Sequence, residues 1–209
     1  RFARAFQDAE FPDARWQVVS FAEPAGDRVR QDQITSGSYS SPPFQRITHR
    51  LGNAPTPSSL LSVHLNTQAV HAPALDGPIA FVNYSEIART FDTERTTFGA
   101  SSAPALRQNG SIYIADFFLQ PTRDNIHQPP PSHWKEIRFH GLGQQDFRLV
   151  TGPMSFEEHL NPDFSTNGAP ITFGYARANS HILRFETVRI SDIDDWNLSL
   201  YTNAPPASP

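Results

Sequence analysis

The chain has 209 residues, of which 38% are hydrophobic and 18% are charged, a length and composition that suit one large folded domain. With 17 basic against 21 acidic residues it lacks the basic excess that nucleic acids or anionic membranes require. It has no cysteine, which excludes disulfides, thiolate metal sites and cysteine nucleophiles, and no apolar run approaches the roughly 18 residues of a membrane span.

Apolar and polar residues alternate with a period of two in many segments, whereas helical periodicity is scarce. In chain order these segments are WQVVSF (16–21), LLSVHLN (60–66), PIAFVNYS (78–85), SIYIADFFL (111–119), KEIRFHGL (135–142), DFRLV (146–150) and DDWNLSLYT (194–202). Turn-forming residues separate them, and 19 prolines leave little room for long helices. The best helical candidate is MSFEEHL (154–160). The pattern predicts two packed antiparallel sheets in a single domain over 1–201, followed by a Pro-rich tail at 202–209.

Several segments, in this order, resemble the concanavalin A-like (laminin G-like) domains of bacterial exported proteins, of the kind found beside cell-surface anchoring signals. The segments are SGSYSSPPFQRITHRL (36–51), GPIAFVNYS (77–85), PALRQNGSIYIA (104–115), HWKEIRFHGLGQQDF (133–147), HLNPDFSTNGAPITFGYARANSH (159–181) and DIDDWNLSLY (192–201). A final strand that opens with Asp-Asn-Trp is typical of that family, and here the triplet is Asp194-Asp195-Trp196. The resemblance implies a two-sheet jelly roll with a concave face, a tendency to bind sugars, and a secreted or cell-surface location. A chain that begins at Arg1 rather than Met is interpreted as a processed or trimmed product, and removal of a signal peptide is one explanation of that start.

An acidic cluster precedes the last predicted strand. Asp192, Asp194 and Asp195 supply the oxygen ligands that calcium prefers, so calcium binding is one interpretation of this cluster, and no other cofactor is expected. Asp192 and Asp194 also alternate along the segment, as the carboxylate pair of a retaining glycoside hydrolase does. A solvated turn explains the same residues, and no catalytic residue is assigned.

Candidate sugar-binding residues follow from their chemistry, because aromatic faces stack on pyranose rings and planar polar groups bond to hydroxyls. We single out Trp134, which lies between His133 and Lys135, and Tyr39 in a serine-rich loop. The third candidate is the set Arg177, Asn179 and His181, which alternate after an apolar strand; a polar strand end explains them as well. Trp16 and Trp196 have the strand phase of core residues.

These observations predict a non-catalytic extracellular module that recognises polysaccharide or cell-surface glycan. One alternative is a structural subunit of an extracellular filament, sheath or surface layer, self-associating through edge strands or the C-terminal tail. A second alternative is a glycoside hydrolase or lyase that uses Asp192 and Asp194.

Overall fold

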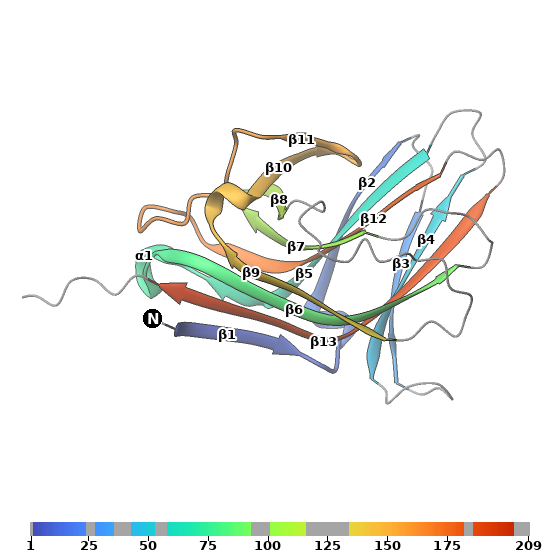
Figure 1. Cartoon of the computed structure of the whole chain (residues 1–209), viewed down its shortest axis with the longest axis horizontal. Coiled ribbons are helices and arrows are strands. Elements are labelled where there is room, and N and C mark those ends of the chain that lie inside the picture. The colour runs from blue at the N-terminus through green and yellow to red at the C-terminus, as the bar shows by residue number, and fades with distance from the viewer. Residues whose placement is uncertain are drawn as a thin grey trace, which may run out of the picture.

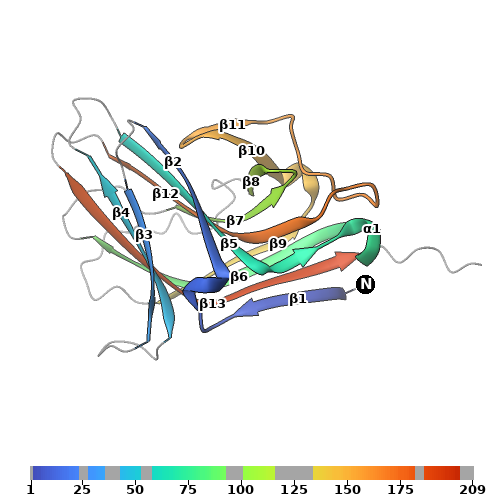
Figure 2. The same cartoon turned by 180° about the vertical axis from the view of Figure 1, so that it is seen from behind.

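The structure, a computed structural model, describes residues 2–23, 28–35, 43–52, 58–92, 101–115, 134–181 and 186–202. These segments form two antiparallel sheets packed face to face, which confirms the predicted all-β sandwich (Figures 1 and 2). Of the predicted tail, Thr202 ends the last strand and 203–209 lie outside the described residues.

The first sheet, here called sheet A, has the strand order β3-β4-β13-β6-β9, and β1 pairs with β13 beyond the end of β4. Its strands are β1 (Phe2–Asp8), β3 (Arg28–Ile34), β4 (Phe44–Leu51), β6 (Ile79–Asp92), β9 (Lys135–Leu142) and β13 (Thr187–Thr202). The long strands β6 and β13 run side by side through its centre (Figure 1).

The second sheet, sheet B, has the order β11-β10-β8-β7-β12-β5-β2. Its strands are β2 (Trp16–Glu23), β5 (Ser58–His71), β7 (Ser101–Gln108), β8 (Ser111–Ala115), β10 (Phe147–Gly152), β11 (Ser155–Glu157) and β12 (Ile171–His181). Sheet B is apolar on both faces over much of its area. Its face away from sheet A carries a second buried cluster that includes Leu61, Val63, Leu65, Ile112 and Ile114.

Helix is almost absent from the described residues. The helical elements there are α1 (Pro73–Asp76) and the 3-10 turns η1 (Asp13–Arg15) and η3 (Gln144–Asp146), none of them long enough to cross a bilayer. The prediction of a helix at 154–160 is wrong: Ser155–Glu157 is strand β11, which forms a hairpin with β10. Phe156 packs against the second apolar cluster, and that tertiary contact outweighs the local helical propensity.

The main core lies between the two sheets and follows the predicted alternation. Trp16 from β2 meets Trp196 from β13 edge to face, with ring centroids 5.2 Å apart, and both are buried as predicted. Phe11, with a positive φ of 46°, also stacks on Trp16, with ring centroids 5.5 Å apart.

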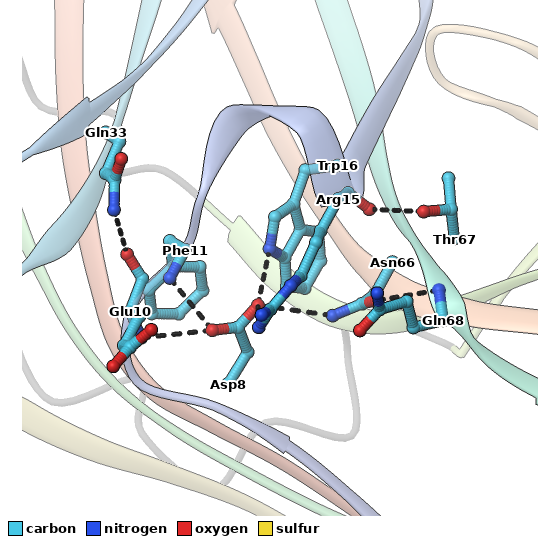
Figure 3. A network of polar contacts seen from close by, with 9 residues as sticks. All are labelled: Asp8, Glu10, Phe11, Arg15, Trp16, Gln33, Asn66, Thr67 and Gln68. Carbon is cyan, nitrogen blue, oxygen red and sulfur yellow. Dashed lines mark hydrogen bonds and ion pairs between the residues drawn. The ribbon is translucent and has the colours of Figure 1, made fainter.

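The carboxylate of Asp8 holds the corner where the chain leaves sheet A for sheet B (Figure 3). It accepts hydrogen bonds from the backbone N–H of Glu10 at 3.0 Å, from that of Phe11 at 2.9 Å and from the indole N–H of Trp16 at 3.0 Å. The guanidinium of Arg15 lies 4.0 Å away. This carboxylate fixes the loop because the N–H groups of Phe11 and Trp16 would otherwise be buried without a partner.

Candidate functional site

The outer face of sheet A, turned away from sheet B, carries a continuous row of uncharged polar side chains. Cross-strand pairing places Asn83 opposite Ser199, Ser85 opposite Asn197, and Asn197 opposite Gln7. Their neighbours along the strands, such as Tyr84 and Leu198, are buried in the core, so these five residues point outward and are partly or fully exposed. We call them the polar band: Gln7, Asn83, Ser85, Asn197 and Ser199.

A cavity of about 490 Å³ opens beside the polar band. It lies where the register of β13 shifts between Asp194 and Asn197 and where Asp195 adopts a positive φ of 48°, as in a β-bulge. Among the residues that line it are amides, carboxylates, a hydroxyl and a guanidinium, supplied by Gln7, Glu10, Arg15, Ser85, Glu136, Asp195 and Asn197. Such a lining donates and accepts hydrogen bonds in several directions, as a polyhydroxylated ligand requires.

Trp134 marks one end of this outer face. It immediately precedes β9 and, by the register of that strand, lies opposite Arg89 on β6. The guanidinium of Arg89 lies 4.3 Å from the centroid of its ring, and Phe44 meets the ring edge to face at 5.7 Å. The indole is only partly buried, so the two contacts hold its orientation and leave part of it open.

Aromatic side chains also mark the other end. Phe81 on β6 stacks on Tyr201 of β13, with ring centroids 4.4 Å apart and planes 13° from parallel. Phe2, 56% exposed, meets Tyr201 edge to face at 5.9 Å. Arg89 follows Phe81 by eight positions along β6, which at the strand rise per residue is roughly 26 Å. The polar band and the cavity lie between these aromatic ends.

Asp192 is held by arginines on the same outer face. Arg46 donates two hydrogen bonds to its carboxylate, at 2.8 and 3.0 Å, and Arg89 donates one at 2.9 Å. Asp192 has no exposed surface. Its neighbour Asp194 points to the same side and is half-buried, and that burial raises the pKa of its carboxyl group.

This arrangement bears on the predicted roles of the acidic cluster. Among the described residues, no three His, Asp or Glu side chains form a group that could hold a metal ion, and the calcium site at Asp192, Asp194 and Asp195 stays a prediction. A glycosidase pair needs two carboxyl groups that reach the sugar. Asp192 is covered and bonded to both arginines, and therefore does not meet that requirement.

The predicted polar set on β12 lies inside the sandwich. Arg177, 1% exposed, pairs with Glu86 of sheet A at 3.1 Å and also donates to the hydroxyl of Ser102. Asn179 donates to Nδ1 of His49 at 2.7 Å. These side chains join the two sheets and do not face solvent. Tyr39, His133 and the side chain of His181 lie outside the described residues.

A chain of hydrogen bonds extends this buried polar cluster across the interior. Ser62 lies between two histidine rings, 2.7 Å from Nε2 of His49 and 2.8 Å from Nε2 of His64, and Nδ1 of His64 lies 2.5 Å from the side-chain oxygen of Gln31. Because Asn179 donates to His49, one set of tautomers satisfies every link: His49 donates to Ser62, Ser62 to His64, and His64 to Gln31. Ser62 and both histidines are fully buried, so this arrangement gives a substrate no access.

Burial sets the protonation states within the cluster. It lowers the pKa of His49 to about 3, with the Arg177 guanidinium adding to the effect, and it lowers the pKa of His64 well below its ordinary value of 6.5. Burial, and next the charge of Glu86, raise the pKa of Tyr84. Tyr84 therefore keeps its proton and donates to Glu86 at 2.5 Å. Both histidines are neutral and Glu86 is satisfied, which makes the cluster a structural feature.

Comparison with known proteins gives weak matches. No protein-family model and no curated protein matches the chain. Among solved structures it is similar to the CBM22-1–GH10 modules of the Clostridium thermocellum xylanase 10B, with 7% identity and a TM-score of 0.39 over 100% of this chain. The chain spans 30% of the length of that xylanase chain.

Two capsid structures give weaker matches still. The decameric BFDV capsid protein is 10% identical, with a TM-score of 0.21 over 90% of this chain and 100% of that one. The 60-mer form is 11% identical, with a TM-score of 0.20 over 93% and 98%. All three TM-scores lie below 0.5, and none of these matches carries an argument about this chain.

Proposed function

We propose that the outer face of sheet A binds a carbohydrate chain, and that the protein is a non-catalytic recognition module. The observation that carries the proposal is the order of side chains along this face. Partly open aromatic rings lie at both ends, at Trp134 and at the Phe81–Tyr201 stack, and the polar band with its cavity lies between them.

The chemistry of a sugar chain matches this order. The C–H faces of pyranose rings pack on aromatic rings, while the hydroxyl groups need donors and acceptors fixed in place. Asn83 illustrates how such groups are held, because its side-chain oxygen accepts a hydrogen bond from the backbone N–H of Gly141 at 2.8 Å, which leaves the amide N–H₂ free to donate outward.

The charge near the cavity favours a neutral sugar over an acidic one. Glu10, Glu136 and Asp195 line the cavity and are exposed, against the single guanidinium of Arg15 among the basic lining residues. An anionic sugar would meet like charges there. We therefore expect neutral polysaccharides to be the ligands, and an extracellular or cell-surface setting is part of the same proposal.

Affinity gel electrophoresis against a panel of soluble neutral polysaccharides tests the proposal. Retardation by at least one of them is expected. Trp134→Ala and Asn197→Ala should each weaken it, Trp134→Ala by about 2 kcal/mol or about thirtyfold in Kd, because the ring is an oriented aromatic anchor. Met154→Ala is the matched control, since Met154 is 50% exposed on the β10–β11 turn of sheet B, away from the proposed face.

Two results would overturn the proposal. One is mobility unchanged by every polysaccharide and by a glycan array of neutral oligosaccharides. The other is retardation that Trp134→Ala and Asn197→Ala leave at the wild-type level, while circular dichroism shows that both variants are folded.

A further inference from the structure

Strand β2 forms one edge of sheet B. Among the described residues, β2 pairs with β5 alone, and on its backbone the carbonyl of Trp16 also accepts a hydrogen bond from the side chain of Gln31 at 3.4 Å. In antiparallel pairing, every second residue turns its backbone N–H and C=O away from the neighbouring strand. Val18 is 36% exposed, and Gln17 and Ser20 are also exposed, so this edge is accessible to a partner.

The composition of β2 differs from that of the two edge strands of sheet A. Residues 16–22, WQVVSFA, contain no charge. By contrast, β3 carries Arg28, Arg30 and Asp32, and β9 carries Lys135, Glu136 and Arg138. Charged side chains on an edge discourage pairing with another chain. Sheet A therefore has protected edges, and β2 lacks that protection.

Charges at the two ends of β2 indicate which partner fits. Arg15 immediately precedes the strand, with a side chain 40% exposed, and Glu23 ends it and is exposed. In an antiparallel pair of two β2 strands centred on Val19, Arg15 of each copy lies opposite Glu23 of the other. A parallel in-register pair would place like charges opposite each other, which is destabilising.

We propose that two copies of this chain associate through β2, in antiparallel register about a two-fold axis at Val19. The uncharged residues 16–22 then pair with themselves, and one Arg–Glu pair closes each end. Such an interface is closed and isologous, so it gives a dimer. It lies at an edge of sheet B and shares Arg15 with the lining of the cavity beside the polar band, but the pairing itself needs no bound carbohydrate.

A single introduced cysteine tests the register, because the natural chain contains none. In Val19→Cys the two thiols face each other across the axis, at a Cα separation of about 4.5–5.5 Å, which a disulfide can span. We expect mild oxidation to give a covalent dimer on non-reducing gels. Arg30→Cys is the matched control, because Arg30 is exposed on the charged edge strand β3. Cross-linking of Val19→Cys no greater than that of Arg30→Cys would overturn the proposal.

Sedimentation equilibrium of the cysteine-free protein gives an independent measurement. The wild type should reach a dimer mass with rising concentration, and Val19→Lys, which places two like charges at the axis, should remain monomeric while still folded. Glu23→Arg should weaken dimerisation roughly tenfold, because both end pairs become repulsive. A wild type that remains monomeric at millimolar concentration, or a Val19→Lys variant that dimerises equally well, would refute self-pairing through β2.

Discussion

Acidification should destabilise this protein well before its carboxylates titrate, because two neutral histidines lie inside the sandwich. His49 and His64 occupy a hydrogen-bonded chain with Ser62 between the sheets, close to the Arg177 guanidinium and the Glu86 carboxylate it pairs with. The pKa of His49 is about 3 and that of His64 is also lowered well below 6.5, both mainly by burial. Below pH 6.5 the unfolded chain therefore takes up protons that the folded chain does not.

The sign and size of the effect follow from this difference. Folding lowers the pKa of each histidine. Above the pKa of the unfolded chain the free energy of unfolding is therefore at its full value, and it decreases as the pH falls through and below that pKa. At pH 5, about 1.5 units below the unfolded pKa, each histidine removes about 2 kcal/mol of unfolding free energy. The two together remove about 4 kcal/mol, a large part of the 5–15 kcal/mol that stabilises a typical domain.

Urea unfolding followed by tryptophan fluorescence at several pH values between 7.5 and 5 measures the slope. His49→Gln and His64→Gln replace each ring by a side chain that hydrogen-bonds without titrating, so each should remove about half of the pH dependence. His140→Gln is the control, because His140 is exposed on β9, and it should leave the slope intact. An equal change in unfolding free energy across this range in all four proteins would show that these two histidines do not cause the pH dependence.

Substitutions at three further places test other parts of the interior. Glu86→Gln leaves the buried Arg177 without a counter-ion and should cost about 3–5 kcal/mol in urea unfolding; Arg177→Met added to it should recover part of that loss. Gly174→Ala would place its Cβ 1.9 Å from the backbone oxygen of His64, so β12 and β5 must separate, and a loss of about 1–3 kcal/mol should lower the melting temperature. Asp8→Ala orphans the donors at the sheet-crossing corner and should cost about 1–3 kcal/mol, measured by denaturant midpoint; an unchanged midpoint would contradict the role given to Asp8.

The period-two alternation predicted the sandwich because every second side chain of a strand faces the core that the two sheets share. WQVVSF and DDWNLSLYT both became strands whose Trp lies inside, as their phase indicated. The helix prediction for 154–160 was wrong because the helical propensity of this short segment was weak. The contact of Phe156 with the second apolar cluster decided its conformation instead.

The polar set on β12 was predicted to share one face, but its burial was not predicted. Alternation established that Arg177 and Asn179 share a face, and they do. It could not establish that the face is the inner one, because a charged residue is expected outside unless a partner is buried with it. That partner, Glu86, lies 91 residues away on a strand of the other sheet, and nothing local in either sequence indicates the pairing.

The candidate site could not be predicted from the sequence for a related reason. The polar band combines residues from β1, β6 and β13, each a single Asn, Gln or Ser in an ordinary strand. Which of them meet depends on the register between strands, and β13 shifts register between Asp194 and Asn197. Trp134 was identified from its flanking loop, but its position opposite Arg89 follows only from the pairing of β6 with β9.

The buried pair and the outer face depend on the same strand register. On β6, Glu86 points inward to Arg177, and Ser85 and Ile87 on either side of it point outward beside the cavity. A slip of one residue would turn Glu86 to solvent and leave Arg177 as an unpaired cation in the core, which costs several kcal/mol. The ion pair therefore specifies which residues of β6 form the outer face, because any other register gives up the only acidic partner that Arg177 has among the described ion pairs.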